Sequence, residues 1–218
     1  KYVKKYLKEK IVIKCGGRVL LDPELFNNFI EDVSILKKLG LTPIVVHGGG
    51  PRIKKKLDEL NIESKFIMGL RVTDEKVIKV VQDVMVKFNK EIVSALEKKL
   101  CKAKSITVNE NSAISAEQKN RELGFVGKPT KINDKLIKSL IKENFIPVVS
   151  PMGLDQKNQT YNINADTAAG ALARSLKSRR LMLMTDVEGV YDKNKKLISE
   201  IKSSEAEELI YNETISEG

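Results

Sequence analysis

The sequence predicts an α/β fold with a mainly parallel central sheet. Two short apolar runs, Ile11 to Lys14 and Thr42 to Val46, each end in glycines and are each followed by a helical pattern. Strand, glycine turn and helix, repeated twice within the first 60 residues, are typical of a parallel sheet covered by helices. Both glycine turns follow the carboxyl ends of their strands, which is the edge at which such sheets bind ligands.

The helices of the first half have recognisable ends. Asp22 is a good N-cap for a helix from Pro23 to Leu39, which has proline at its first position and glycine just beyond its end. A second helix is predicted from Pro51 to Leu60. Apolar residues then recur at helical spacing from Asp74 to Leu100, which predicts a long third helix.

The second half continues the alternation of strands and helices. Further strands are predicted at Ser105 to Val108, Phe145 to Ser150 and Arg180 to Thr185. The polar, glycine-containing segment Asn109 to Lys131 is predicted to form a hairpin and loop. Helices are predicted at Asp134 to Glu143 and Ala165 to Ser175, and a last one starts at Glu205 to Ile210.

Composition excludes several classes of protein. No run approaches 18 apolar residues, which argues against a membrane-spanning helix, and the charged N-terminus lacks the apolar core of a secretory signal. Two cysteines suit a reducing cytoplasm, and a single histidine gives little support to a histidine-based metal site or catalytic triad. The net charge of +10 comes from dispersed lysines without aromatic stacking platforms, so we expect no nucleic-acid partner.

The two glycine turns carry the residues that phosphate chemistry needs. Lys14 stands at the end of the first strand beside Gly16 and Gly17, and the run Gly48 to Gly50 follows the neighbouring strand. Glycines let backbone N–H groups approach a phosphate, and lysine adds a point charge. Neither turn matches the P-loop or the dinucleotide fingerprint. Two facing nests would stabilise a phosphoryl group in transfer, and the alternative is two tight turns without a ligand.

Two further positions are candidates for binding. Arg71, between Leu70 and Val72, is either a surface residue or a clamp for a carboxylate. The run from Asn162 to Asp166 places Asn162, Asn164 and Asp166 before or at the start of a helix, and N-capping needs only one of them. We therefore expect a site there, in which Asp166 holds Lys14 or a metal ion.

Seven sequence runs together resemble one family. The runs VIKCGG, VVHGGGP, GLRVTD, KFNKEIVSAL, ELGFVG, YNINADTAAGALA and LMTDVEGVY follow the order and spacing of N-acetylglutamate kinases of the amino-acid kinase superfamily, and the resemblance spans residues 1–218. It implies a three-layer αβα sandwich like that of carbamate kinases. It also implies an N-terminal lobe, residues 1–176, that binds acetylglutamate and dimerises. Residues 177–218 would then begin an ATP-binding lobe.

The resemblance assigns the transfer chemistry to the glycine turns. It implies that Lys14 reaches the phosphates of ATP and stabilises the transferring group, while Asp166 organises the catalytic lysines. Backbone N–H groups around that group are assigned to Gly16, Gly17, Gly49 and Gly50. A carboxylate nucleophile is already ionised at neutral pH, so the reaction needs no general base, only alignment and charge neutralisation, with Mg²⁺ as cofactor.

The same resemblance implies the substrate and nucleotide contacts. Arg71 would clamp the α-carboxylate of N-acetyl-L-glutamate, and Asn162, Gly48 and Gly49 would also contact this substrate. The implied ATP site consists of Lys14, Gly16, Thr185, Asp186, Gly189 and Tyr191. No protein side chain is assigned to the metal.

The resemblance also has consequences for assembly and completeness. Residues 2–7 are similar to the extra helix of hexameric, arginine-sensitive members, which implies a homodimer or hexamer with L-arginine as feedback inhibitor. The family's second catalytic lysine lies just beyond a segment similar to residues 215–218, so we expect the chain to be a trimmed form of a longer protein. Two local departures are a reshaped loop at Lys104 to Asn111 and Cys15 in place of tyrosine, as a buried hydrophobe or a reactive thiol.

The leading hypothesis is an ATP-dependent acetylglutamate kinase of arginine biosynthesis, located in the cytoplasm. One alternative is a sister kinase that acts on another carboxylate, such as N-acetylaminoadipate or aspartate. A second is a non-catalytic or regulatory subunit, which binds ATP without turnover.

Overall fold

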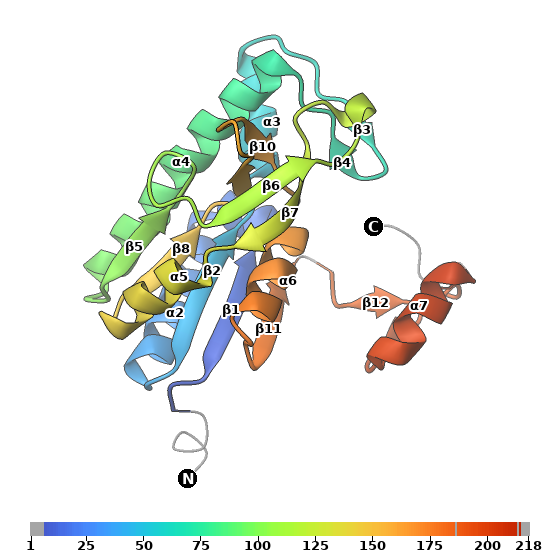
Figure 1. The fold of residues 1–218 in the computed structure, drawn as a ribbon. Coiled ribbons are helices and arrows are strands. Elements are labelled where there is room, and N and C mark those ends of the chain that lie inside the picture. The colour runs from blue at the N-terminus through green and yellow to red at the C-terminus, as the bar shows by residue number, and fades with distance from the viewer. Residues whose placement is uncertain (1–6, 186, 213, 215–218) are drawn as a thin grey trace.

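A five-stranded parallel sheet, in the order β11-β1-β2-β8-β5, organises the molecule (Figure 1). The computed structural model describes residues 7–185, 187–212 and 214. The strands of this sheet are β1 (Lys10–Cys15), β2 (Thr42–His47), β5 (Ala103–Ile106), β8 (Ile146–Val149) and β11 (Arg180–Met184). The mainly parallel sheet predicted from the sequence is therefore confirmed.

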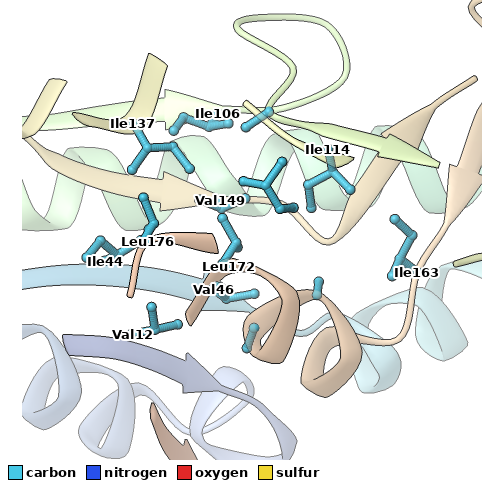
Figure 2. Packing of buried hydrophobic residues seen from close by; sticks show 14 of the residues in the cluster. Val12, Ile44, Val46, Ile106, Ile114, Ile137, Val149, Ile163, Leu172 and Leu176 are labelled. Atoms are coloured by element: carbon cyan, nitrogen blue, oxygen red, sulfur yellow. The ribbon is translucent and has the colours of Figure 1, made fainter. Parts of the chain in front are cut away.

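Helices cover both faces of this sheet. They are α2 (Pro23–Lys38), α3 (Gly50–Glu59), α4 (Glu75–Lys98), α5 (Asp134–Lys142) and α6 (Ala165–Ser175). Side chains alternate along a strand, so Ile11 and Ile13 of β1 pack against α2 and α4, while Val12 packs with residues of α5 and α6. Figure 2 shows the side of the sheet that α5 and α6 cover, where Val12 and Leu172 belong to one apolar cluster. The layers are helix, sheet and helix, as predicted.

A second, mixed sheet lies at the carboxyl end of the first and has the order β10-β9-β6-β7. Its strands are β6 (Ile114–Gln118), β7 (Gly127–Ile132), β9 (Met152–Leu154) and β10 (Thr160–Asn162), with a 3-10 turn at Arg121–Leu123. The antiparallel pair β6 and β7 confirms the hairpin predicted within residues 109–131. Strands β9 and β10 were not predicted, because three residues are too few to show a period.

The helix ends follow the capping residues. The Asp22 carboxylate accepts hydrogen bonds from the N–H groups of Glu24 and Leu25, as predicted, and such a cap is worth about 1 kcal/mol. Asp74 caps α4 in the same way, so the helix begins one residue later than predicted and ends at Lys98. Helix α3 begins one residue earlier than predicted, at Gly50.

One strand boundary was wrong. The strand predicted at residues 105–108 is β5, two residues earlier, because its pairing with β8 joins Ala103 to Ile146 and Ile106 to Val149. Backbone hydrogen bonds in both directions between Thr107 and Glu110 then close a turn, which ends the strand. This turn lies within the loop for which we predicted a changed shape.

The last described part of the chain begins within the main sheet. Strand β11 pairs with β1 over five residues and then leads to β12 (Val190–Tyr191), β13 (Leu197–Ile198) and α7 (Ser203–Tyr211). Figure 1 shows β12 and α7 set apart from the main sheet. The side chains of Leu181 to Met184 are 37–48% exposed. The proposed division at residue 176 stays a prediction, and residues 2–6 of the predicted extra helix and residues 215–218 lie outside the described residues. Among the described helices, none combines the length and apolarity that crossing a bilayer requires.

Candidate active site

The two glycine turns meet in one pocket of about 240 Å³ at the carboxyl ends of β1 and β2. The register pairs Cys15 with His47, so the residues that follow these strands are neighbours. The Gly48 N–H donates to the Cys15 carbonyl at 2.7 Å and ties the turns together. Every residue of both predicted nests lines the pocket, namely Gly16, Gly17, Gly48, Gly49 and Gly50.

Lys14 and Asp166 form an ion pair at this pocket. The Lys14 Nζ lies 3.0 Å from the Asp166 Oδ1, and their side chains are 13% and 48% exposed. Asp166 stands in the first turn of α6, where the Asn164 side chain accepts from its N–H and acts as N-cap. A Cβ added to Gly16 would lie 2.9 Å from Nζ, so glycine makes room for the ammonium group. Of the two roles considered for Asp166, the structure has the carboxylate holding lysine, and the described residues contain no cluster of three metal-binding side chains.

The N-terminus of α3 presents unpaired donors to the pocket. Within the described part of the chain, the N–H groups of Gly49 and Gly50 have no hydrogen-bond acceptor. A Cβ on Gly49 would lie 2.2 Å from the sulfur of Met85, so the close packing of α4 requires glycine there. Free N–H groups and the positive end of a helix dipole together favour an anion at this point.

Arg71 lies in the pocket wall and is only 8% exposed, which excludes the surface role considered for it. It belongs to the two-residue strand β4 (Leu70–Arg71), which pairs with β3 (Phe66–Ile67). Its guanidinium donates to the Gly50 carbonyl at 3.2 Å and to the Ser64 hydroxyl, and lies 4.6 Å from the centre of the Phe66 ring. These contacts hold a buried cation in one orientation, as a carboxylate clamp requires.

Asn162 reaches the same pocket from β10. Its Nδ2 donates to the Thr73 hydroxyl at 3.3 Å, and that hydroxyl donates to the Arg71 carbonyl at 2.8 Å. The side chain is therefore linked to the segment that carries the arginine. Its position joins two segments that are 89 residues apart in sequence.

The residues assigned to the nucleotide are not all at this pocket. Lys14 and Gly16 line it, whereas Thr185, Gly189 and Tyr191 do not, and Asp186 lies outside the described residues. The assigned residues of the 185–191 turn therefore stay a prediction of a separate nucleotide contact. At about 240 Å³ this pocket is small for a ligand site.

Sequence reasoning missed the apolar part of the pocket. Its lining includes Ile53, Phe66, Met85, Val126 and Ile163. These residues carry no signal of their own, because an apolar side chain that lines a ligand pocket has the same helical or strand periodicity as one in the core.

Cys15 is fully buried, and burial raises the pKa of its thiol to about 12, against the lowering effect of Lys14. A thiol with so high a pKa is not a nucleophile at neutral pH. Of the two roles predicted for Cys15, the structure therefore favours the buried hydrophobe.

His47 ends β2 and is fully buried. Burial lowers the pKa of its imidazole to about 4, with a further lowering by Arg52 and a partial compensation by a hydrogen bond with the Gly48 carbonyl. The imidazole is therefore neutral throughout the physiological range.

The depressed pKa predicts a specific pH dependence of stability. The folded pKa of His47 lies below the unfolded value of 6.5, so its contribution to stability is fully present above pH 6.5 and is lost as pH falls toward 4. The loss amounts to about 3 kcal/mol, from about 1.4 kcal/mol per pKa unit. Urea unfolding of the wild type and of His47→Gln at pH 7 and pH 4 isolates the contribution of the histidine to the free energy of unfolding, because the variant has no imidazole. Equal losses in the two proteins would contradict the buried, neutral imidazole.

Comparison with known proteins places the chain in a family. Residues 9–218 match the model of the amino acid kinase family. The chain is 60% identical over its whole length to acetylglutamate kinase of Pelagibacter ubique, of which it covers 76%. It is 44% identical to acetylglutamate kinase of Caldicellulosiruptor bescii, of which it covers 78%.

Solved structures give the same assignment at the level of fold. The smu.665 protein of Streptococcus mutans superposes with a TM-score of 0.85 at 28% identity, over 96% of this chain and 85% of that one. Carbamate kinase of Giardia lamblia bound to AMP-PNP superposes with a TM-score of 0.64 at 14% identity, over 95% of this chain and 84% of that one, which supports the fold only. The chain belongs to the amino acid kinase family, and within it to the acetylglutamate kinases.

Proposed function

We propose that this protein transfers the γ-phosphoryl group of ATP to the side-chain carboxylate of N-acetyl-L-glutamate, giving N-acetylglutamyl 5-phosphate. One observation carries the proposal: a single pocket combines the Lys14 ammonium, the unpaired N–H groups of Gly49 and Gly50, and the buried guanidinium of Arg71. The lysine with the glycine N–H groups is one anion-binding feature and the arginine is a second, which matches an acid that has one carboxylate to phosphorylate and one to hold. The family membership supports the same assignment.

The acid is held at the Arg71 end of the pocket. The guanidinium is fixed by the Gly50 carbonyl, the Ser64 hydroxyl and the Phe66 ring, so little entropy is lost when it pairs with the α-carboxylate. Asn162, at the other side of Thr73, provides amide groups to the same acid. Gly48 and Gly49 let the acid approach the backbone closely.

Transfer takes place at the other end, where Lys14 lies. The side-chain carboxylate of the acid is the nucleophile and is ionised at neutral pH, so no general base is needed. The residues instead align the reactants and stabilise charge on the transferring group, through the lysine and the glycine N–H groups at the start of α3. Asp166 keeps the ammonium group at the pocket.

ATP supplies the phosphoryl group, and we infer that Mg²⁺ accompanies its phosphates. We assign the ligands of this ion mainly to phosphate oxygens and water, as is usual for Mg²⁺ that binds together with a nucleotide. The rest of the nucleotide is assigned to the turn that contains Thr185, Gly189 and Tyr191, with Asp186.

We further infer a cytoplasmic homo-oligomer, a dimer or a hexamer, with L-arginine as feedback inhibitor of the hexameric form. The similarity of residues 2–7 to the extra helix of hexameric members carries this inference. Light scattering that finds a monomer at micromolar concentration would refute it.

The function is tested by trapping the acyl phosphate as its hydroxamate, with ATP and Mg²⁺. We expect turnover with N-acetyl-L-glutamate, and at least about 100-fold lower kcat/KM with N-acetylaminoadipate or aspartate, because an added or missing group in a fitted pocket costs a few kcal/mol. ADP release is followed in parallel to include UMP as acceptor.

The other outcomes identify the alternatives. Preference for N-acetylaminoadipate or aspartate would make the protein a sister kinase. Binding of ATP by calorimetry without turnover of any acid would point to a non-catalytic subunit.

A further inference from the structure

The histidine of β2 lies directly before the glycine turn and inside the core. His47 is 0% exposed, and its ring meets the Phe88 ring edge to face at a centroid distance of 5.1 Å. It is the single histidine of the sequence. The proposed transfer reaction does not use it as an acid or base, so its two polar nitrogens in an apolar layer need another explanation.

Both nitrogens are hydrogen bonded, and the bonds define the tautomer. The Asn89 Nδ2 donates to the Val148 carbonyl at 2.9 Å and lies 3.1 Å from the His47 Nε2. A rotated amide would turn its oxygen toward that carbonyl, so Nδ2 is the donor on both sides. The His47 Nε2 therefore accepts, and Nδ1 carries the hydrogen.

The protonated nitrogen holds the glycine turn. His47 Nδ1 lies 3.0 Å from the carbonyl oxygen of Gly48 and donates to it. That carbonyl belongs to the peptide unit that ends in the Gly49 N–H, and this unit is trans. In a trans peptide the C=O and N–H groups point in opposite directions. With its carbonyl held toward the buried imidazole, the unit directs the Gly49 N–H to the other side, where Gly49 lines the pocket.

We propose that His47 and Asn89 are positioning residues, which orient the Gly48–Gly49 peptide so that its N–H donates to the transferring phosphoryl group. The inference rests on the proposed function. A chain of hydrogen bonds runs from the Val148 carbonyl in β8 through Asn89 of α4 and His47 of β2 to the backbone of the turn. The unpaired Gly49 N–H is the group that this chain of hydrogen bonds prepares.

A role limited to core packing does not explain these residues. Within the described part of the chain, the Asn89 Oδ1 is buried and has no hydrogen-bond partner. An amide with an unsatisfied oxygen costs stability, and an apolar residue of similar shape would avoid that cost. The position is therefore explained by what its Nδ2 holds rather than by packing.

The variants separate the two hydrogen bonds of the imidazole. His47→Asn keeps a donor near the place of Nδ1, and His47→Phe keeps the aromatic packing without either bond. We expect kcat to fall by on the order of 100-fold in His47→Phe, as for loss of one aligned backbone donor. We expect the KM for ATP to stay within about twofold, because the donor acts on the transition state. His47→Asn should recover at least about tenfold of the lost kcat, because its amide restores the bond to Gly48.

A spectroscopic measurement tests the arrangement without any turnover. Labelling with ¹⁵N-histidine gives the signals of one imidazole, because the sequence has one histidine. We expect a protonated Nδ1 and an unprotonated Nε2 at pH 7. In Asn89→Leu, which removes the donor to Nε2, we expect the tautomer signals to shift and kcat to fall. A protonated Nε2 in the wild type would overturn the proposal.

The matched control is Ser34→Ala. Ser34 is also fully buried, and its hydroxyl donates to the Ile30 carbonyl at 2.7 Å, within α2 and outside the pocket. We expect this variant to lose stability without loss of kcat.

Equal kcat in His47→Phe and wild type, or equal loss of kcat in His47→Asn and His47→Phe, would refute the positioning role. Should His47→Phe fail to fold, Asn89→Leu and His47→Asn decide by the same criteria. A wild type without turnover would refute the proposed function. The tautomer of His47 would still show whether its Nδ1 donates to Gly48 and its Nε2 accepts from Asn89.

Discussion

Replacement of Lys14 by methionine is expected to lower kcat by about 10³-fold, because it removes the ammonium group at the pocket. Methionine has a similar length and fills the same space, so packing between β1 and α6 is retained. The lost group stabilises charge that develops in transfer, so the KM for N-acetyl-L-glutamate should change by less than about threefold. Steady-state kinetics with hydroxamate detection measures both constants.

The control for this variant is Lys104→Met. Lys104 also lies on a strand of the main sheet, but it is exposed and outside the pocket, and we expect wild-type kinetics from its replacement. Thermal unfolding of Lys14→Met should be close to that of the wild type, because the partner Asp166 is 48% exposed and an ion pair of this kind contributes little to stability. Retention of more than about a tenth of wild-type kcat would remove Lys14 from the transfer step.

Replacement of Arg71 by lysine is expected to raise the KM for N-acetyl-L-glutamate by about 100-fold and to leave the KM for ATP unchanged. Lysine keeps the charge but has no planar fork, so it cannot pair with a carboxylate through two parallel hydrogen bonds. A loss of about 3 kcal/mol of binding corresponds to this factor. The stacking on Phe66 and the bond to the Gly50 carbonyl are lost as well, which frees the remaining cation to move.

Arg121→Lys is the matched control, since this arginine is exposed on the 3-10 turn and does not line the pocket. Calorimetric titration of both variants with N-acetyl-L-glutamate separates binding from turnover. Unchanged affinity in Arg71→Lys would place the α-carboxylate elsewhere. Reduced affinity for ATP instead of the acid would mean that the arginine faces the nucleotide.

The parallel sheet was predictable because its signals are local. An apolar run that ends in glycines, as at Lys14 to Gly17, reports a buried strand followed by a turn in a window of a few residues. Asp22 and Asp74 likewise act on the N–H groups that follow them in sequence, so the starts of α2 and α4 were predicted to within one residue. Strand β5 was misplaced because its ends depend on pairing with β8, about 40 residues away.

The candidate site was predictable only where a residue type is unusual for its place. Glycines after a strand, and the three polar residues Asn162, Asn164 and Asp166 around the start of α6, exceed what turns and caps need. Whether Arg71 is buried or exposed could not be decided from sequence, because its burial depends on contacts with Phe66, Ser64 and Gly50. The hydrogen bond between His47 and Asn89 could not be predicted for the same reason, because the two residues are 42 positions apart.

The sequence by itself therefore determined the order along the chain of the five main-sheet strands and of the helices that cover them, the two glycine turns and, through its sequence runs, the family. The tertiary structure decided that Lys14 pairs with Asp166, that Arg71 is buried beside the turn, and that the carbonyl of Gly48 faces an imidazole. The physical reason is the separation along the chain over which each kind of interaction acts. Backbone propensities and caps act between neighbours in the chain, whereas ion pairs, burial and the direction of a donor exist only after distant segments have packed together.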